Sequence, residues 1–448
     1  MKKNRLYLAL LVVFLGAAGF VIIKFRGEER NKKNLVYQLL ERKGILAAAD
    51  EWINTKKSAS KLVMAIQANP DDIKSKITLA NLFILEARAT GNYAYYDKAA
   101  MKYVNDVLEK EPGNFEALTL KALLYLSQHH FADGLALAER AEKINSHNAF
   151  IYGILVDGHV EMGHYDSAVA SAEKMMSIRP DLRSYARAAY LRELHGDYAG
   201  AIAAMKLAID AGAPGDEATE WSRVQLGHLY ENVGDLPNAA MHYTIALNER
   251  PGYVHAMAGM ARIALAAKDY NKAIALYQQA DSLGTDFSLK EELVDVYQLA
   301  GQREKAIATA KIVIDEMNKN AVAAATDENI GHYADKELAY AYLKISDYDK
   351  ALAHALAEYN RRPENIDVNE TLAWVYYQRG DYEKALPYIK VALKTNSKNP
   401  VLLCRAGLIY DKVSDKATAK NYLQQALKNN PNIPEPLKLS SEQALKKI

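Results

Sequence analysis

Cysteine is nearly absent from this sequence, because only Cys404 among the 448 residues carries a thiol. A single thiol excludes an intramolecular disulfide, a Cys-rich zinc site and an iron–sulfur cluster bound by this chain's thiolates alone. Glycine (23 residues) and proline (12 residues) are also scarce, which excludes collagen-like and low-complexity chains. Half of the residues are hydrophobic and a quarter are charged, as is typical of a folded helical protein.

Motifs of catalysis are missing as well. The sequence has no nucleophile elbow, phosphate-binding loop, dinucleotide fingerprint or zinc-protease helix. His159, Glu161 and His164 are close in sequence, but a turn between the histidines keeps them off one helix face, and His129-His130 occupies a turn expected to be solvated. We therefore expect no enzyme activity, no catalytic residues, no cofactor and no metal site.

The charge is unevenly distributed along the chain. Residues 1–33 hold eight Lys or Arg and two Asp or Glu, which leaves 48 basic and 53 acidic residues in the remainder. A body of net charge near −5 argues against general nucleic-acid binding.

The amino terminus contains one long uncharged run. A basic flank (1–5) precedes 18 uncharged residues (6–23), and a linker follows (24–34). At about 1.5 Å per residue the run nearly spans a bilayer of about 30 Å, so we favour a retained transmembrane helix over a cleaved signal segment. Flanking charges slightly favour a cytoplasmic body, whereas the export-signal character of the flank favours an extracytoplasmic one. We expect a single-pass membrane protein with an extracytoplasmic body.

A repeat dominates the rest of the chain. Short turns recur at spacings of 34, 33, 38, 34, 33, 45, 34 and 34 residues, beginning at His129, Gly163, Gly196, Gly234, Lys268, Gly301, Ser346, Gly380 and Ser414. Glycine at the first turn position can end a helix in the left-handed conformation, and Asp at the next position can cap the following helix. Each turn therefore predicts the end of one helix and the start of another.

Small residues keep the same register. The fifth residue after a turn begins is alanine in eight of the nine turns, with Gly134 as the exception. Small side chains recur seven residues before the turn, and tyrosines often follow three positions later, as in Leu226-Gly227-His228-Leu229-Tyr230 and Leu372-Ala373-Trp374-Val375-Tyr376. This pattern resembles the tetratricopeptide repeat.

The resemblance implies an all-α, right-handed superhelical solenoid of about ten helix pairs over residues 71–431. Residues 35–70 are expected to form a degenerate helical pair, and residues 432–448 a capping helix. About eleven extra residues between Val313 and Gly331 predict a longer second helix or an inserted one, and they mark the expected break in the superhelix.

The resemblance also implies that the first helices line a concave groove that binds a partner segment. The residues expected there are mostly aromatic or acidic: Tyr190, Glu193, Trp221, His228, Glu231, His255, Arg262, Glu291, Asp295, Tyr333, Lys336, Tyr340, Asp367, Glu370, Trp374 and Tyr377. Tyr333, Tyr340, Trp374 and Tyr377 form the expected anchor cluster. Asp367 and Glu370 beside it predict a partner segment bearing Lys or Arg.

These features favour a membrane-tethered, bacterial-type scaffold for protein–protein interaction. The alternative is an exported glycan-binding or glycan-processing accessory protein, in which carboxylates such as Glu291 and Asp295 serve glycoside chemistry. Exposure on a solvated helix face argues against the raised acid pKa that this chemistry needs.

Overall fold

The computed structural model describes residues 14–17, 19–20, 24, 36–284, 288–326, 332–430 and 432–448. The predicted flank (1–5), twelve of the eighteen residues of the predicted membrane helix (6–23) and all of the predicted linker (24–34) except Lys24 lie outside the described residues, as does Pro431. No helix in the described part of the chain combines the length and apolarity needed to cross a membrane.

Every regular element of the described residues is a helix, and ten consecutive helix pairs run from α3 to α22. A short 3₁₀ turn and α2 precede the pairs, and α23 follows them. The bounds are η1 (Gly44–Ala48), α2 (Asp50–Ala68), α3 (Ile73–Thr90), α4 (Tyr93–Lys110), α5 (Phe115–Ser127), α6 (Phe131–Ile144), α7 (Ala149–Met162), α8 (Tyr165–Ile178), α9 (Leu182–Leu194), α10 (Tyr198–Asp210), α11 (Glu217–Asn232), α12 (Leu236–Glu249), α13 (Val254–Ala266), α14 (Tyr270–Leu283), α15 (Ser288–Leu299), α16 (Arg303–Thr326), α17 (Asp335–Lys344), α18 (Tyr348–Arg361), α19 (Ile366–Arg379), α20 (Tyr382–Ala392), α21 (Pro400–Lys412), α22 (Lys416–Asn429) and α23 (Glu435–Leu445).

The turns inside the pairs have the predicted left-handed conformation. The first turn residue has positive φ at all nine predicted positions, even where it is His129 (φ 62°) or Ser414 (φ 66°) instead of glycine. The aspartate that follows caps the next helix in five of them: Asp197, Asp235, Asp269, Asp347 and Asp415 each accept a hydrogen bond from the backbone N–H three residues later. Each turn triplet therefore ends one helix with its first residue and begins the next helix after its second.

Small residues allow the two helices of a pair to approach closely. The eight alanines predicted to face the partner helix are at most 1% exposed. At Gly227, a β-carbon would lie 2.4 Å from the ring of Tyr243, so only glycine fits there. The apolar core is accordingly a series of small clusters between neighbouring helices, as expected for a stacked array.

One segment differs from the sequence-based expectation, and a second has one of the two predicted forms without the predicted break. Residues 36–43 form no helix, so a single α-helix (α2) replaces the pair predicted over 35–70. The reason is that tyrosine hydroxyls from α4 satisfy this backbone: Tyr96 accepts from the N–H of Leu40 (3.1 Å), and Tyr95 donates to the carbonyl of Gln38 (2.7 Å). The extra residues after Val313 lengthen α16 to 24 residues, and the superhelix continues through α17.

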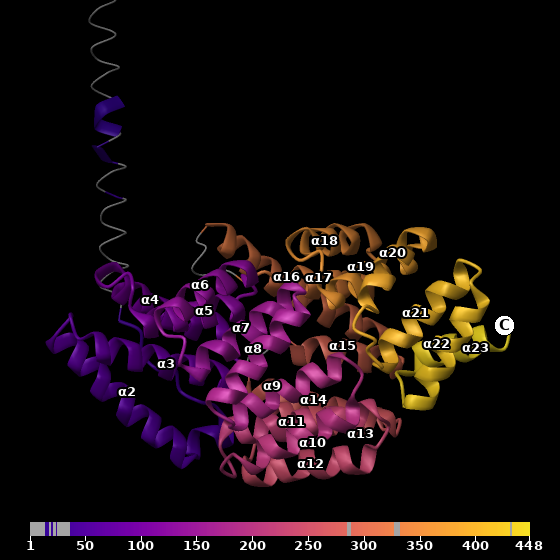
Figure 1. Ribbon diagram of the computed structural model, residues 1–448, viewed down its shortest axis with the longest axis horizontal. Helices are drawn as coiled ribbons and strands as arrows, with labels where there is room; N and C mark the ends of the chain where they lie inside the picture. Colours follow the sequence, from indigo (N-terminus) through magenta and orange to yellow (C-terminus); the bar gives the residue numbers. More distant parts are fainter. Residues whose placement is uncertain are drawn as a thin grey trace, which may run out of the picture.

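The superhelix closes on itself. Contacts join residues separated by 199 to 205 positions, including Glu51 with Arg250, His129 with Tyr333, Val160 with Asn365, and Glu231 with Asn430. About six 34-residue repeats therefore complete one turn. Figure 1 shows the result: α16 to α18, in orange, lie beside α6 and α7, in purple, and the chain between them runs around the opposite side through α9 to α14.

Candidate binding cavity and the contact between superhelical turns

One large cavity lies inside the superhelix. Its volume is about 1370 Å³, and its walls come from helices α3 to α17. Tyr93, Phe131, Phe150, Tyr190 and Trp221 supply aromatic surface to it. Tyr190 is 37% exposed and Trp221 is 36% exposed, so each presents part of its ring to the cavity. We call this space the interior cavity.

Charged side chains of both signs line the same walls, with acidic groups in excess. The lining includes nine Asp or Glu and six Lys or Arg residues. Ion pairs hold some of them in place, as between Arg187 and Asp157 (2.6 Å). Desolvation raises the pKa of Glu193 to about 7, although Asn232 donates a hydrogen bond to it (3.0 Å). Acidic residues are therefore in excess in the cavity wall, and one of them, Glu193, is partly protonated near neutral pH.

Only some of the predicted groove residues line the interior cavity. They are Tyr190, Glu193, Trp221, His255 and Glu291. His255 meets the ring of Trp221 edge to face, with the ring centroids 5.1 Å apart. The other predicted residues are engaged by partners within the chain.

Arg262 contacts two of these residues. It donates to Glu231 (3.0 Å) and to Nε2 of His228 (2.5 Å), and it forms an ion pair with Glu292 (3.4 Å). Burial and the charge of Arg262 lower the pKa of His228, so its imidazole is neutral and accepts this hydrogen bond. The group is a satisfied polar network between adjacent repeats and not a free recognition surface.

Arg405 occupies the centre of the predicted anchor cluster. It donates to the hydroxyl of Tyr340 (2.8 Å) and to Glu370 (2.9 Å), and its guanidinium lies 5.0 Å from the ring centroid of Trp374. Tyr377 stacks on Trp374 with ring centroids 4.8 Å apart. The structure thus brings Tyr340, Trp374 and Tyr377 together as predicted, but the cation expected from a partner comes from this chain.

Tyr333, Lys336 and Asp367 lie between superhelical turns. Tyr333 stacks on His130 (4.2 Å) and lies under the guanidinium of Arg361 (4.5 Å). Burial alone would lower the pKa of Lys336, but the carboxylates of Asp367, Glu337 and Glu161 raise it. The prediction that His129-His130 is solvated is wrong for His130, which is 5% exposed because Tyr125 and Tyr333 stack on it.

The pKa of Asp295 differs from the expectation for a solvated helix face. Desolvation inside the superhelix raises this pKa, and the nearby ammonium of Lys344 partly offsets the increase. About half of the Asp295 side chain remains accessible to solvent. The ammonium of Lys344 lies 3.1 Å from Asp295 and donates to the carbonyl of Glu291 (2.8 Å). Lysine therefore holds Asp295 as an ion pair.

Family models match three parts of the chain. Models described as tetratricopeptide repeat match residues 224–286, 336–400 and 401–433. The chain contains tetratricopeptide repeats. No protein of curated function matches the sequence.

Several solved structures are similar to this chain at low identity. A thermophilic tetratricopeptide protein of Thermus thermophilus, TTC0263, is 20% identical, with 43% of this chain and 99% of that chain covered and a TM-score of 0.38. The human IFIT1 dimer with PPP-AAAA is 16% identical, with 78% and 80% covered and a TM-score of 0.48. A tetratricopeptide repeat protein of Parabacteroides merdae ATCC 43184 is 18% identical, with 59% and 98% covered and a TM-score of 0.35.

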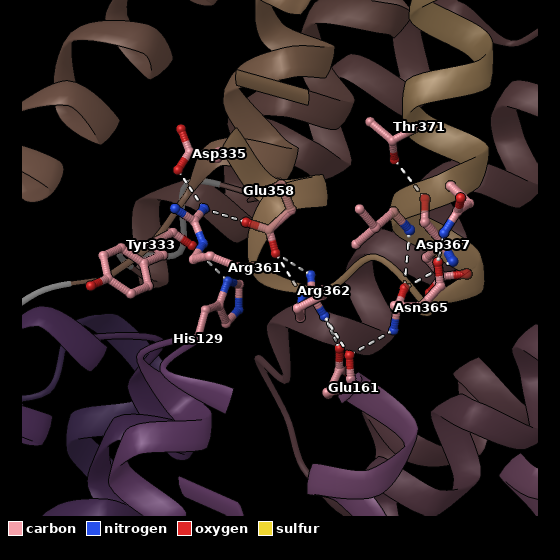
Figure 2. A network of polar contacts seen from close by, with 12 residues as sticks. His129, Glu161, Tyr333, Asp335, Glu358, Arg361, Arg362, Asn365, Asp367 and Thr371 are labelled. Carbon is pink, nitrogen blue, oxygen red and sulfur yellow. Dashed lines mark hydrogen bonds and ion pairs between the residues drawn. The ribbon is translucent and has the colours of Figure 1, made fainter. Parts of the chain in front are cut away.

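The contact between superhelical turns joins tetratricopeptide repeats that are distant in sequence. Arg362, at the end of α18, pairs with Glu358 (2.5 Å) and with Glu161 of α7 (Figure 2). Its guanidinium also lies 4.3 Å from the ring centroid of Phe131. The side chains of Arg362 and Glu358 are 5% and 3% exposed. The Arg362–Glu358 pair is therefore buried on one side of the contact, and the ion pair that crosses the contact joins Arg362 to Glu161, whose side chain is 35% exposed.

Asn365 and Ile366 extend this contact. The amide of Asn365 donates to the backbone carbonyls of Val160 and Glu161, and the backbone N–H of Ile366 donates to the hydroxyl of Tyr165 (2.9 Å). Ile366 joins the apolar cluster of the α7–α8 repeat. We call the set Glu161, Gly163, Tyr165, Arg362, Glu364, Asn365 and Ile366 the inter-turn contact.

Sequence reasoning missed the inter-turn contact because its members are about 200 residues apart. In the sequence, Glu161 is distinguished only as a weak metal candidate between His159 and His164, whose rings are 5.8 Å apart in the structure. In the structure, Glu161 instead pairs with Arg362. The number of repeats per superhelical turn decides which repeats meet, and a 34-residue period does not specify that number.

Proposed function

We propose that this protein is a non-enzymatic scaffold whose tetratricopeptide superhelix binds a segment of a partner protein in the interior cavity. The observation that carries the proposal is the cavity itself: a space of about 1370 Å³ with partly exposed aromatic rings and charged walls inside a repeat fold. Rigid aromatic side chains bury a large area at low entropic cost, which makes Trp221 and Tyr190 the proposed anchors.

The charge of the walls favours a basic partner segment. The lining contains nine acidic residues and six Lys or Arg residues, and this excess of acidic groups complements Lys or Arg on the partner. The basic specificity first inferred from Asp367 and Glu370 is therefore proposed for the interior cavity, because Glu370 is already paired with Arg405.

Membrane tethering remains part of the proposal and rests on the sequence. The uncharged run of residues 6–23 supports a single-pass anchor of bacterial type, and the export-signal character of the basic flank (1–5) favours a folded body outside the cytoplasm. A tether raises the local concentration of the scaffold at the membrane relative to a free partner. Retention of the full-length chain in membranes washed with alkaline carbonate tests the anchor.

A peptide array tests the cavity. Twelve-residue segments of net charge +3, 0 and −3 are presented to the purified full-length chain, and dissociation constants of the best binders are measured by fluorescence anisotropy. We expect positively charged segments to bind, and Trp221→Ala to weaken them by about thirtyfold, since loss of an aromatic anchor costs about 2 kcal/mol. Affinity should rise between pH 6 and 8, because Glu193, whose pKa is about 7, must ionise to face a cation.

Tyr348→Ala is the matched control for that experiment. Tyr348 is 37% exposed, as Tyr190 is, but it does not line the cavity. It should leave the affinity unchanged, and Glu193→Gln should remove the pH dependence. Equal losses in the Trp221 and Tyr348 variants, or no preference for charge, would contradict binding in the cavity.

A further inference from the structure

Two histidines and a glutamate from distant parts of the chain meet beside the interior cavity. His129 lies in the turn between α5 and α6, whereas His332 and Glu337 lie just before and within the first turn of α17. One ligand atom from each of the three side chains lies within 4.8 Å of the other two. The rings of His129 and His332 are 4.0 Å apart between centroids.

The hydrogen bonding of His129 orients it for metal binding. Its Nδ1 lies 2.9 Å from the backbone carbonyl oxygen of Tyr333. A carbonyl only accepts, so Nδ1 carries the proton and Nε2 keeps a free lone pair. A histidine that donates one ring N–H to a carbonyl and offers the other nitrogen is the usual arrangement around a protein-bound metal.

The carboxylate of Glu337 supports the same reading. Its Oε2 is buried and accepts no hydrogen bond in the described structure, so this oxygen keeps lone pairs that a metal ion can use, while the carboxylate also interacts with Lys336.

We propose that His129, His332 and Glu337 form a zinc site that joins two turns of the superhelix. Two imidazoles and one carboxylate are a known Zn²⁺ ligand set, with metal–ligand distances of about 2.0 to 2.2 Å. Ligand atoms within 4.8 Å of one another need to move by only about 1 Å to reach that geometry. All three residues line the interior cavity, so the fourth coordination position is open to water or to a ligand from it.

Such a site goes beyond partner binding. It acts as a clamp, because its ligands come from segments about 200 residues apart that meet only when the superhelix closes. The expectation of no metal site rests on residues close in sequence, such as His159 and His164, whereas these ligands lie one superhelical turn apart.

Zinc titration of the full-length chain tests the proposal. The protein carries a purification tag without histidine and is freed of metal by chelation. It is then titrated with ZnCl₂ against a chromophoric chelator, and the zinc bound per chain is measured by elemental mass spectrometry. We expect one zinc per chain, at least 100-fold weaker binding in His332→Ala, and at least tenfold weaker binding in Glu337→Gln. Zinc should raise the thermal unfolding midpoint of the wild type and not that of Glu337→Gln.

His164→Ala is the control, because it removes a turn histidine that is not a proposed ligand, and it should bind zinc like the wild type. The near-isosteric Glu337→Gln guards against misfolding, which circular dichroism also monitors. Less than about 0.1 zinc per chain in the wild type overturns the proposal. Equal zinc binding in the wild type, His332→Ala and Glu337→Gln, or loss of zinc in His164→Ala, overturns it as well.

Discussion

Gly163→Ala is expected to force the two superhelical turns apart. Gly163 has φ +83°, and a β-carbon on it would lie 2.4 Å from the backbone carbonyl carbon and oxygen of Glu364. Backbone cannot rotate aside as a side chain can, so the contact must open. Left-handed strain costs about 1 to 2 kcal/mol and overpacking about 1 to 3 kcal/mol. We expect a total loss of about 3 kcal/mol and a larger radius of gyration by small-angle X-ray scattering.

Gly380→Ala separates strain from steric contact. Gly380 occupies the same turn position with φ +85°, but a β-carbon there would have no neighbour within 4 Å. This variant should lose about 1 kcal/mol from backbone strain and keep the wild-type radius. Equal losses of stability and an unchanged radius in both variants would show that Gly163 does not touch the next turn in solution.

Arg362→Ala is expected to have a similarly large effect for an electrostatic reason. Removing the guanidinium leaves only Lys336 to oppose the desolvation of Glu161, which already raises the pKa of this carboxyl. Glu358 retains Arg361, so the loss should fall near about 3 kcal/mol, at the lower end for breaking a buried pair. Hydrogen exchange should accelerate in both α7 and the start of α19, although these helices are about 200 residues apart.

Arg379→Ala is the matched control for Arg362. Arg379 pairs with Asp349 at 2.6 Å, but Asp349 is 91% exposed, so water replaces the lost partner. We expect a cost of at most about 1 kcal/mol and faster exchange only near α18 to α20. If Arg362→Ala accelerated exchange in α19 and left α7 protected, the ion pair to Glu161 would not exist in solution.

The repeat could be predicted from the sequence because its causes are local. Turn triplets such as Gly196-Asp197-Tyr198 contain both the left-handed stop and the capping aspartate, and the following alanine, Ala201, fixes which face packs. The 34-residue spacing then gives the number of pairs. Where the extra residues after Val313 would go could not be predicted, since a longer α16 and an inserted helix satisfy the same spacing.

The candidate site could be predicted only in part. The helical phase correctly places Tyr190 and Trp221 on the inner surface. It does not show that Arg405 comes from the next repeat to fill the space between Tyr340 and Trp374. The inter-turn contact depends on the small rotation between repeats, which accumulates over about six repeats and is set by packing details at every interface.

Closure also changes how stability should be distributed. In an open array each repeat contacts only its neighbours, and stability is close to a sum of local terms. Here Ile366 packs with Val160 and Tyr165, and Arg250 pairs with Glu51 (2.6 Å), so repeats one turn apart stabilise each other. A partner or a metal ion bound in the interior cavity would therefore be expected to stabilise these contacts between superhelical turns.

Zero-length cross-linking tests the central claim, closure of the superhelix, most directly. The ammonium of Lys268 lies 2.8 Å from the carboxylate of Glu435, and the two residues are 167 positions apart and accessible to reagent. Carbodiimide treatment of the full-length chain should yield a Lys268–Glu435 amide, identified by mass spectrometry and shown to be intramolecular by mixing isotopically labelled and unlabelled chains. Lys416 and Asp411, 2.6 Å apart, serve as the local positive control. Coupling of the local pair without any Lys268–Glu435 product would contradict the closed superhelix.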